Sequence, residues 1–288
     1  SEGPPGALRG PAMQPGAVWS VNTEEKWQGV GRSPVGDGTF KSGLAGSALD
    51  REQRVEVLKV AADGAPTRLR VQQVRDRQIF EMDGDRNEEL APWAGKSLEY
   101  LYDADGRCTI ASDENKKKKK QRSRKKRRKK RRHRGPKVEV PEPEASSDLG
   151  CPPLSFGLYP VGAVRPGEPW TPRPGAVRAA LGLAPEVGLT IKSSAMRLLG
   201  VEDPEDQPRY ARVVWKLRCD LRFPDSTAHE WDVMFHIKRS LTSFVDIERK
   251  VEGKRVIMEP ASAGGMRFEG DVEASVRITV ERRPGVEP

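Results

Sequence analysis

The chain has few of the residues that usually build catalytic or metal centres: three cysteines and three histidines among 288 residues. It has no Cys-x-x-Cys and no His-x-x-x-His, so the spacing offers none of the convergent nitrogen and sulfur ligands that zinc requires. Gly-x-Ser-x-Gly is absent, and no cysteine lies near a histidine in an interpretable motif. We therefore predict no catalytic residue, no metal and no cofactor, and we expect a protein that is not an enzyme.

Long apolar runs are also lacking. No eighteen consecutive apolar residues occur, so the sequence predicts no membrane-spanning helix. Residues 1–16 are rich in proline and glycine and are predicted to form a flexible leader. Such a leader is typical of the segment after the cleavage site of exported or lipid-anchored bacterial proteins, and a plain disordered tail fits the same composition.

Two short stretches imitate ligand-binding motifs and lack their essential residues. Gly29–Pro34 begins like a phosphate-binding loop, but it has no Lys-Ser/Thr ending and no long helix follows it. Asp103–Gly106 begins like a calcium loop, but Arg107 stands at the fifth position and Cys108 at the sixth, where glycine is needed. We interpret the first stretch as a loop and the second as a hairpin turn.

Charge is concentrated in one place. The formal net charge is +9, yet residues 116–134 contain sixteen Lys or Arg and no acid, which leaves −7 for the rest of the chain. The rest of the sequence shows no basic cluster of the kind that a nucleic-acid-binding surface carries. The predicted polyanion-binding residues are Lys116, Lys117, Lys118, Lys119, Lys120, Arg122, Arg124, Lys125, Lys126, Arg127, Arg128, Lys129, Lys130, Arg131, Arg132 and Arg134.

This basic run has several interpretations. A flexible polycation can bind nucleic acid through released counterions, and without interleaved aromatic residues it would track phosphates and not sequence. It can equally bind an anionic surface such as acidic lipid or a polyanionic polymer, or serve as a nuclear address in a eukaryote. A solvated insertion without any partner is the remaining alternative, because such runs expand in loops without disturbing a fold.

The segment 113–149 contains the basic run followed by Pro, Glu and Ser, with almost no apolar residues. It cannot bury enough surface to offset its ordering entropy, and its like charges repel one another, so we predict a disordered linker. The linker separates a strand-rich half at 17–112 from a second at 150–288.

Alternation of apolar and polar residues predicts strands in the second half. From Val213 to Phe223 the pattern has period two, which indicates one buried and one wet face. Residues 230–238 and 271–283 repeat it, and 243–260 suggests a hairpin that turns near Gly253. Helical periodicity is confined to brief stretches such as 177–183.

In the first half, 53–74 predicts two strands about a turn at 63–66, residues 78–85 a third, and 96–112 a further hairpin. The predicted fold class is therefore mainly β, with antiparallel halves arranged as a sandwich, a meander or a half-barrel. One echo suggests a duplication, because MQPGAVW (13–19) and VRPGEPW (164–170) share Pro-Gly-x-x-Trp; a chance match is the alternative.

The segments PGAVWSV, LAPWAGKSLEYLYDADGRC and LYPVGAVRPGEPW, with the strand-rich end of the chain, resemble uncharacterised exported β-rich proteins of high-GC Gram-negative bacteria. The resemblance implies a periplasmic or lipoprotein-like location and assigns no activity. The basic run departs from that pattern.

The cysteines allow two interpretations. Cys108 and Cys151 flank the linker and would form a disulfide in an oxidising compartment, where closing the loop would stabilise the fold by roughly 4 kcal/mol. Two unrelated free thiols are the alternative. Cys219 lies on the apolar face of its strand and is expected to act as a small buried hydrophobe.

Together these features predict a non-enzymatic, exported β-rich binding or structural protein at the cell envelope, whose polycationic loop associates with polyanions; a half-barrel would also let the body bind an apolar ligand. One alternative is an intracellular protein that binds nucleic acid without sequence specificity through 116–134. A second is a β-fold hydrolase or transferase, for which Asp225, Glu230 and Asp232 would be candidate acids and bases.

Overall fold

The computed structural model describes residues 8, 14–35, 39–62, 64–90, 95, 97–103, 107–111, 155, 157–160, 164–184, 186–205, 209–241, 243 and 245–281. The described strands form one antiparallel sheet of twelve. They are β1 (Val18–Val35), β2 (Thr39–Val60), β3 (Pro66–Met82), β4 (Asp85–Leu90), β5 (Ser97–Tyr102), β6 (Cys108–Ile110), β7 (Pro169–Trp170), β8 (Gly188–Glu202), β9 (Tyr210–Arg222), β10 (Ala228–Ser240), β11 (Asp246–Met258) and β12 (Arg267–Glu281). The described part also contains the helix α2 (Pro174–Leu181) and the short 3-10 helix η1 (Ala261–Ala263). The mainly β prediction is confirmed.

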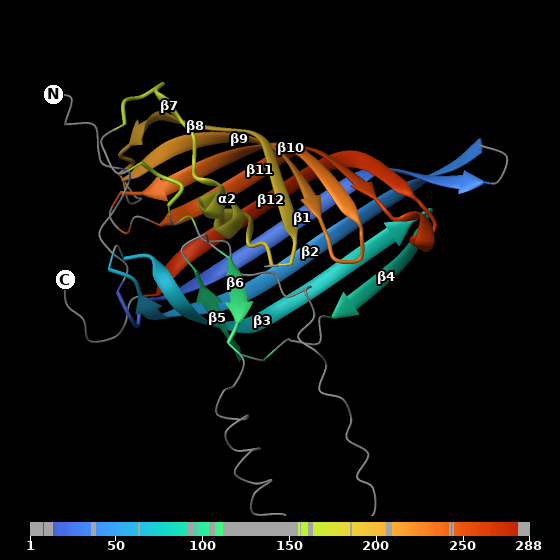
Figure 1. Cartoon of the computed structure of the whole chain (residues 1–288). Helices are drawn as coiled ribbons and strands as arrows, with labels where there is room; N and C mark the ends of the chain where they lie inside the picture. Colours follow the sequence, from blue (N-terminus) through green and yellow to red (C-terminus); the bar gives the residue numbers. More distant parts are fainter. Residues whose placement is uncertain are drawn as a thin grey trace, which may run out of the picture.

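The first and last strands join the two halves of the chain into this single sheet. The order is β6-β5-β3-β2-β1-β12-β11-β10-β9-β8-β7, with β4 beside β3. β1 pairs with β12 from Val18 opposite Glu281 to Arg32 opposite Arg267, so chain segments about 250 residues apart lie side by side (Figure 1). The other neighbouring pairs along this path are consecutive strands, except that β4 intervenes in the chain between β3 and β5, and α2 lies between β7 and β8.

The sheet curves around α2, which lies against one of its faces (Figure 1). We call this the inner face. On β9, alternate residues from Val213 to Leu221 are buried there, while Lys216 and Arg218 lie on the outer face and are exposed. This is the period of two that the sequence predicted. Trp215 stacks on Phe235 of the neighbouring strand, with ring centroids 4.4 Å apart.

Helix α2 fills the space between the two ends of the sheet. Its N-terminus begins with proline, which needs no hydrogen-bond partner there, and it ends at Gly182 in the left-handed conformation, with φ 63°. Four of its eight residues are buried: Ala176, Val177, Ala179 and Ala180. Ala179 belongs to the core cluster that includes residues of β1, β2, β3 and β5. The other three belong to the cluster that includes residues of β8, β9 and β10. The helix therefore packs against both parts of the sheet.

Two expectations about the strands were wrong. The proposed hairpin turn near Gly253 does not exist, because β11 runs straight through it. The glycine serves close packing instead, since a Cβ there would collide with the carbonyl oxygen of Asp232 on β10. Residues 78–82 are not a separate strand but the end of β3, and the chain turns into β4 at Asp83 and Gly84, which both have positive φ.

The hairpin expected at 96–112 is present as β5 and β6, with Tyr102 opposite Cys108. The two Pro-Gly-x-x-Trp stretches form similar turns. Gly16 and Gly167 have φ of 87° and 86°, and each donates its N–H to a carbonyl of a neighbouring strand, that of Val57 in β2 and that of Leu198 in β8. The two sequence stretches therefore share the conformation of their turn.

Candidate functional site

A cavity of about 480 Å³ lies at one end of the inner face, where β3 and β11 end and β4 and β12 begin. This volume falls within the range of small-molecule sites, roughly 300–1,000 Å³. The cavity is mostly apolar. Its walls are Trp27, Ala45, Gly46, Ser47, Phe80, Glu81, Met82, Asp85, Arg86, Asn87, Arg255, Ile257, Glu259 and Phe268.

Strand register explains why these residues meet. Trp27 of β1 lies opposite Ser47 of β2, which in turn lies opposite Phe80 of β3, and residues directly opposite in an antiparallel pair share a face. A second row of directly opposite residues lies beside this one, and it runs across the sheet from Arg255 of β11 to Ala45 of β2. The cavity is thus built from six strands that no local sequence window contains.

Two glycines occupy the middle of the row between Arg255 and Ala45. They are Gly270 of β12 and Gly29 of β1, which lie opposite each other. A Cβ on either would collide with the backbone of the other strand, so the two strands approach closely here. Next to them the ring of Phe268 lies over Gly31. The interpretation of Gly29–Pro34 as a loop was therefore wrong: the stretch is part of β1, and its glycines serve packing.

Arg255 reaches across β12 to β1 because Gly270 has no side chain. Its Nη1 donates to Oε1 of Glu25 at 2.8 Å, and the Arg255 side chain is 15% exposed. Its guanidinium also lies 5.8 Å from the centre of the Trp231 ring. The pair neutralises the charge of Arg255 at the wall of the cavity.

Two N–H donors at this wall have no acceptor among the described residues. They are Nε1 of Trp27 and Nε of Arg255, and both atoms are buried. The Trp27 ring is held edge-on by Phe268, with ring centroids 6.3 Å apart. Buried donors in proteins are nearly always paired, so each such orphan requires an explanation.

His229 lies on the same face, opposite Ile257. It is part of β10 and only 9% exposed. Burial, together with the positive charge of Arg255, lowers the pKa of His229 to about 3, so the imidazole is neutral at physiological pH. Its ring packs against Phe223, with centroids 4.6 Å apart.

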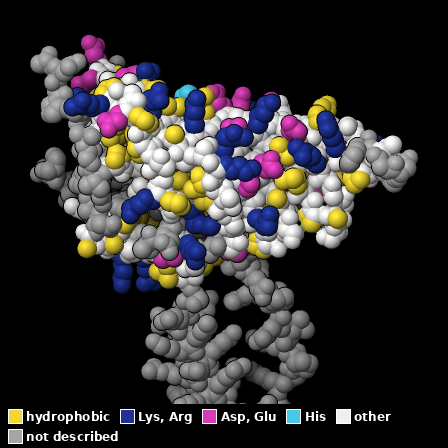
Figure 2. Space-filling model, turned by 45° about the horizontal axis from the view of Figure 1, so that its top comes forward, with side chains coloured by type: hydrophobic (Ala, Val, Ile, Leu, Met, Phe, Trp, Pro, Cys, Tyr) yellow, Lys and Arg dark blue, Asp and Glu magenta, His cyan; other side chains and the backbone are white. Residues whose placement is uncertain are grey.

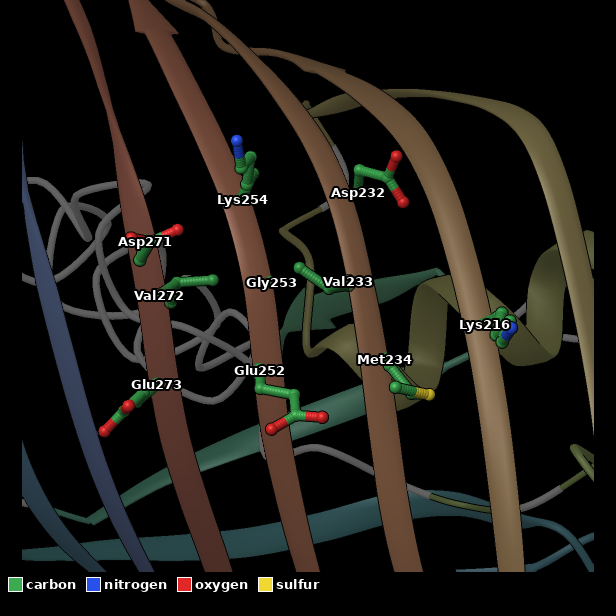
Figure 3. Close-up of a pocket in the computed structure, with 10 residues that line it drawn as sticks. All are labelled: Lys216, Asp232, Val233, Met234, Glu252, Gly253, Lys254, Asp271, Val272 and Glu273. Atoms are coloured by element: carbon green, nitrogen blue, oxygen red, sulfur yellow. The ribbon is translucent and has the colours of Figure 1, made fainter.

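A second pocket, of about 590 Å³, lies on the outer face over the glycine of β11 (Figure 3). Its residues come from four neighbouring strands, and α2 lies behind the sheet. They are Lys216, Asp232, Val233, Met234, Glu252, Gly253, Lys254, Asp271, Val272 and Glu273. The charged groups here are solvated and already engaged in part: Asp232 pairs with Arg218 at 3.2 Å, and Glu252 with His236 at 3.2 Å.

A buried ion cluster lies near α2. Asp246 accepts hydrogen bonds from Tyr159 at 2.7 Å, Arg239 at 2.9 Å and Arg249 at 3.0 Å. Burial alone would raise the pKa of Asp246, but the two guanidiniums and the Tyr159 hydroxyl hold it below its ordinary value. Arg249 also donates to the carbonyl of Ala180, so the cluster ties α2 to β11.

The sites predicted from sequence have mixed outcomes. The sixteen basic residues of 116–134, the linker 113–149 and Cys151 lie outside the described residues. Cys108 is disulfide-bonded and Cys219 is a free, buried thiol, whose pKa burial raises to about 12. The pairing of Cys108 with Cys151 stays a prediction.

The proposed acid and base residues are not assembled into a catalytic arrangement. Asp225 accepts the N–H of Thr227 in the β9–β10 turn at 2.9 Å, while Asp232 lies on the outer face in its ion pair with Arg218. Among the described residues no group of three or more His, Cys, Asp or Glu side chains is arranged to hold a metal ion. No helix in the described part of the chain is long and apolar enough to cross a membrane.

The surface of the described body mixes both signs of charge. Figure 2 shows basic and acidic side chains interspersed over the face in view, with apolar side chains between them. Many are paired across strands, for example Arg54 with Glu281 at 2.9 Å and Arg77 with Glu88 at 2.7 Å.

Sequence reasoning missed the inner-face cavity. Its apolar residues look like ordinary strand residues, and the only local signal was the concentration of glycines in β1 and at 270. Those glycines mark a close approach of two strands, which becomes meaningful only when the register is known.

Comparison with known proteins gives no family. No protein-family model matches the chain, and no curated protein matches it. Among solved structures, it is similar to lipovitellin, in a structure on lipid–protein interactions, with 10% identity and a TM-score of 0.33; the match covers 96% of this chain and 26% of that one, so the chain spans about a quarter of lipovitellin.

Two bacterial structures are also similar over most of their length. A DUF1329 family protein from Desulfovibrio piger has 6% identity and a TM-score of 0.13, and a putative outer membrane lipoprotein-sorting protein domain from Vibrio parahaemolyticus has 9% identity and a TM-score of 0.14. In each case 93% of this chain and 87% of the other are covered.

Proposed function

We propose that this protein is a non-enzymatic, exported binding protein that holds the apolar chain of a lipid-like ligand in the inner-face cavity. The observation that carries the proposal is the cavity itself: about 480 Å³, with a wall whose exposed surface is mainly apolar and which the curved sheet closes on one side. Apolar cavities of this size with a few polar groups are the usual sites for apolar and amphipathic ligands.

The mouth of the cavity supports this function. Phe80 and Met82 of β3 line the cavity, yet they are 47% and 40% exposed. Exposed apolar side chains at the rim of a cavity are typical of ligand-binding grooves, since a bound apolar chain removes them from water. The disulfide at Cys108 supports an oxidising compartment, and with it the periplasmic or envelope location.

Ligand binding is tested by filling the cavity. Ala45 lines it, while its neighbour Leu44 is 74% exposed and lies on the outer face. Binding of a fluorescent acyl-chain probe to the purified chain should be lost in Ala45→Trp and kept in Leu44→Trp, which adds a ring of similar size outside the cavity. Equal binding by both variants, with unchanged circular dichroism spectra, would place the ligand elsewhere. Ser47→Phe offers a second filling substitution.

We further propose that residues 116–134 associate with polyanions such as acidic lipid, an anionic polymer or nucleic acid. Sixteen basic residues without an acid support this, through counterion release and attraction to anionic surfaces. Binding to anionic vesicles, RNA and duplex DNA across a salt series should fall steeply with salt and vanish when 116–134 is deleted. The preferred polyanion separates the envelope role from the alternative of an intracellular nucleic-acid-binding protein. The deletion should leave binding in the cavity unchanged.

A further inference from the structure

Apolar side chains that face water gather at the end of the sheet where the cavity opens. Four exposed large apolar residues lie there: Val30, Leu44, Phe80 and Met82. Leu44, at 74%, is the most exposed large apolar residue of the described chain. Val30 lies directly opposite Leu44. Met82 lies opposite Ala45, the next residue along β2, so the four residues are close neighbours. We call these four residues the tip.

The tip is apolar on both faces of the sheet. Phe80 and Met82 line the inner-face cavity, whereas Leu44 and Val30 lie together on the outer face. A partner that docks against one face of a sheet leaves the other face in water. An apolar layer that surrounds the tip covers both faces at once and removes all four side chains from water. The arrangement therefore favours a lipid layer as the partner.

The strands next to the tip project beyond the rest of the sheet (Figure 1). Pairing of β1 with β12 ends at Arg32, and pairing of β2 with β3 begins at Ala45. Among the described strands, residues 33–35 and 39–43 therefore pair only with each other. This end of the molecule is a slender two-stranded ribbon, which can enter a soft layer without moving the rest of the sheet.

The projecting ribbon carries little charge. From 30 to 44 the sequence has two bases and one acid, which are Arg32, Lys41 and Asp37. The carboxylate of Asp83, beside the tip, already accepts a backbone N–H of β2 at 3.0 Å. Few charges would therefore have to leave water, and the two bases suit the phosphates of a lipid surface.

We propose that the tip enters a lipid bilayer to the boundary of headgroups and acyl chains, and seats the mouth of the cavity against it. An apolar chain then passes into the cavity without crossing water. The inference rests on the proposed function of the cavity. Two of the tip residues already line the cavity, so the docking surface is continuous with the ligand site. The exposed charged side chains of the rim, Glu81, Asp85 and Arg86, remain among the headgroups.

Association with phosphatidylcholine vesicles tests the docking. These vesicles have no net charge, so they do not attract residues 116–134 as anionic lipid would. The full-length protein should sediment with the vesicles, and Leu44→Ser should weaken this association about tenfold. Leu199→Ser is the matched control, because Leu199 is 47% exposed on β8, near the far edge of the sheet; it should leave the association unchanged. Equal effects of the two substitutions, or no association of the parent protein, would overturn the inference.

A dye at position 44 reports insertion directly. Leu44→Cys labelled with a polarity-sensitive fluorophore should brighten on the vesicles, whereas the same dye on Leu199→Cys should not. Cys219 is buried, so labelling of the native protein is confined to the introduced thiol. The measurement does not depend on a loss of binding, and it decides the inference even if Leu44→Ser is destabilised. Equal responses at the two positions would contradict the docking.

Transfer of a ligand separates failure of the inference from failure of the proposed function. A fluorescent acyl-chain probe carried by the vesicles should pass to the parent protein about tenfold faster than to Leu44→Ser. Its binding from solution should be the same for both, because Leu44 lies outside the cavity. Binding from solution with equal transfer rates would overturn only the inference.

The remaining outcomes are equally distinct. If the probe does not bind from solution, the proposed function is wrong, and the dye at position 44 still shows whether the tip enters a bilayer. Self-association of the parent protein that Leu44→Ser abolishes, without any response to vesicles, would assign the tip to a second copy of the chain and overturn the inference.

Discussion

Arg249 donates from Nε to Oδ2 of Asp246 at 3.0 Å, with the two side chains 2% and 0% exposed. The same carboxylate also binds Arg239 and Tyr159, so a single acid holds two buried guanidiniums. Removing it would leave both cations without their counter-ion in a medium where unpaired charge is costly.

We predict that Asp246→Asn lowers the free energy of unfolding by about 3–5 kcal/mol. The measurement is urea denaturation followed by circular dichroism at neutral pH. Asp232→Asn breaks an exposed ion pair on the outer face and should cost less than about 1 kcal/mol. Similar losses in the two variants would contradict the assigned role of the buried cluster.

His229 should make the protein sensitive to acid. In the unfolded chain its pKa lies near the ordinary 6.5, whereas burial and Arg255 lower the folded-state pKa to about 3. The unfolded state therefore binds the proton first as the pH falls. The contribution to stability is complete above about pH 6.5 and declines from there toward pH 3, with a slope of at most about 1.4 kcal/mol per pH unit.

His229→Phe, which keeps a planar ring, should flatten the dependence of unfolding free energy on pH between 6.5 and 4. The slope is the readout, since the substitution can also change the absolute stability. His236→Gln is the control, because His236 lies on the outer face of the same strand and is exposed. A slope in His229→Phe as steep as in the parent protein would show that other groups cause the acid sensitivity.

Gly270 should tolerate no side chain. A Cβ there would meet the carbonyl oxygen of Gln28 and the Cα of Gly29. We expect Gly270→Ala to destabilise the fold by about 1–3 kcal/mol or more and to weaken ligand binding. Gly200→Ala, in β8 with open space around it, should be neutral or stabilise by up to about 1 kcal/mol. Thermal unfolding of the two variants side by side checks the contrast.

The thiols give a chemical test of the cysteine assignment. Cys219 is free and buried, and burial raises its pKa to about 12, so an alkylating reagent at pH 8 should leave the native protein unlabelled. In urea without reductant, one thiol per chain should react, and with reductant three. Peptide mapping should then join Cys108 to Cys151; labelling of two or more thiols before reduction would contradict that pairing.

Local pattern determined the fold class and several elements. The period of two from Val213 to Leu221 specifies one buried face wherever the strand is placed, and the Asp-Gly-Ala-Pro turn specifies the hairpin between β2 and β3. The brief helical stretch predicted at 177–183 overlaps α2 (Pro174–Leu181), whose C-cap glycine adopts positive φ. These features depend on residues that are near one another in the chain, so the sequence alone is sufficient to predict them.

Only the tertiary structure decided how these strands meet. Pairing of β1 with β12 depends on register across about 250 residues, and no local pattern encodes it. Gly253 shows the consequence: an isolated glycine in a strand pattern looks like a turn until the neighbouring backbone of β10 is seen to press against it. The cavity has the same origin, because Arg255, Gly270, Gly29 and Ala45 form one row only after four strands are aligned.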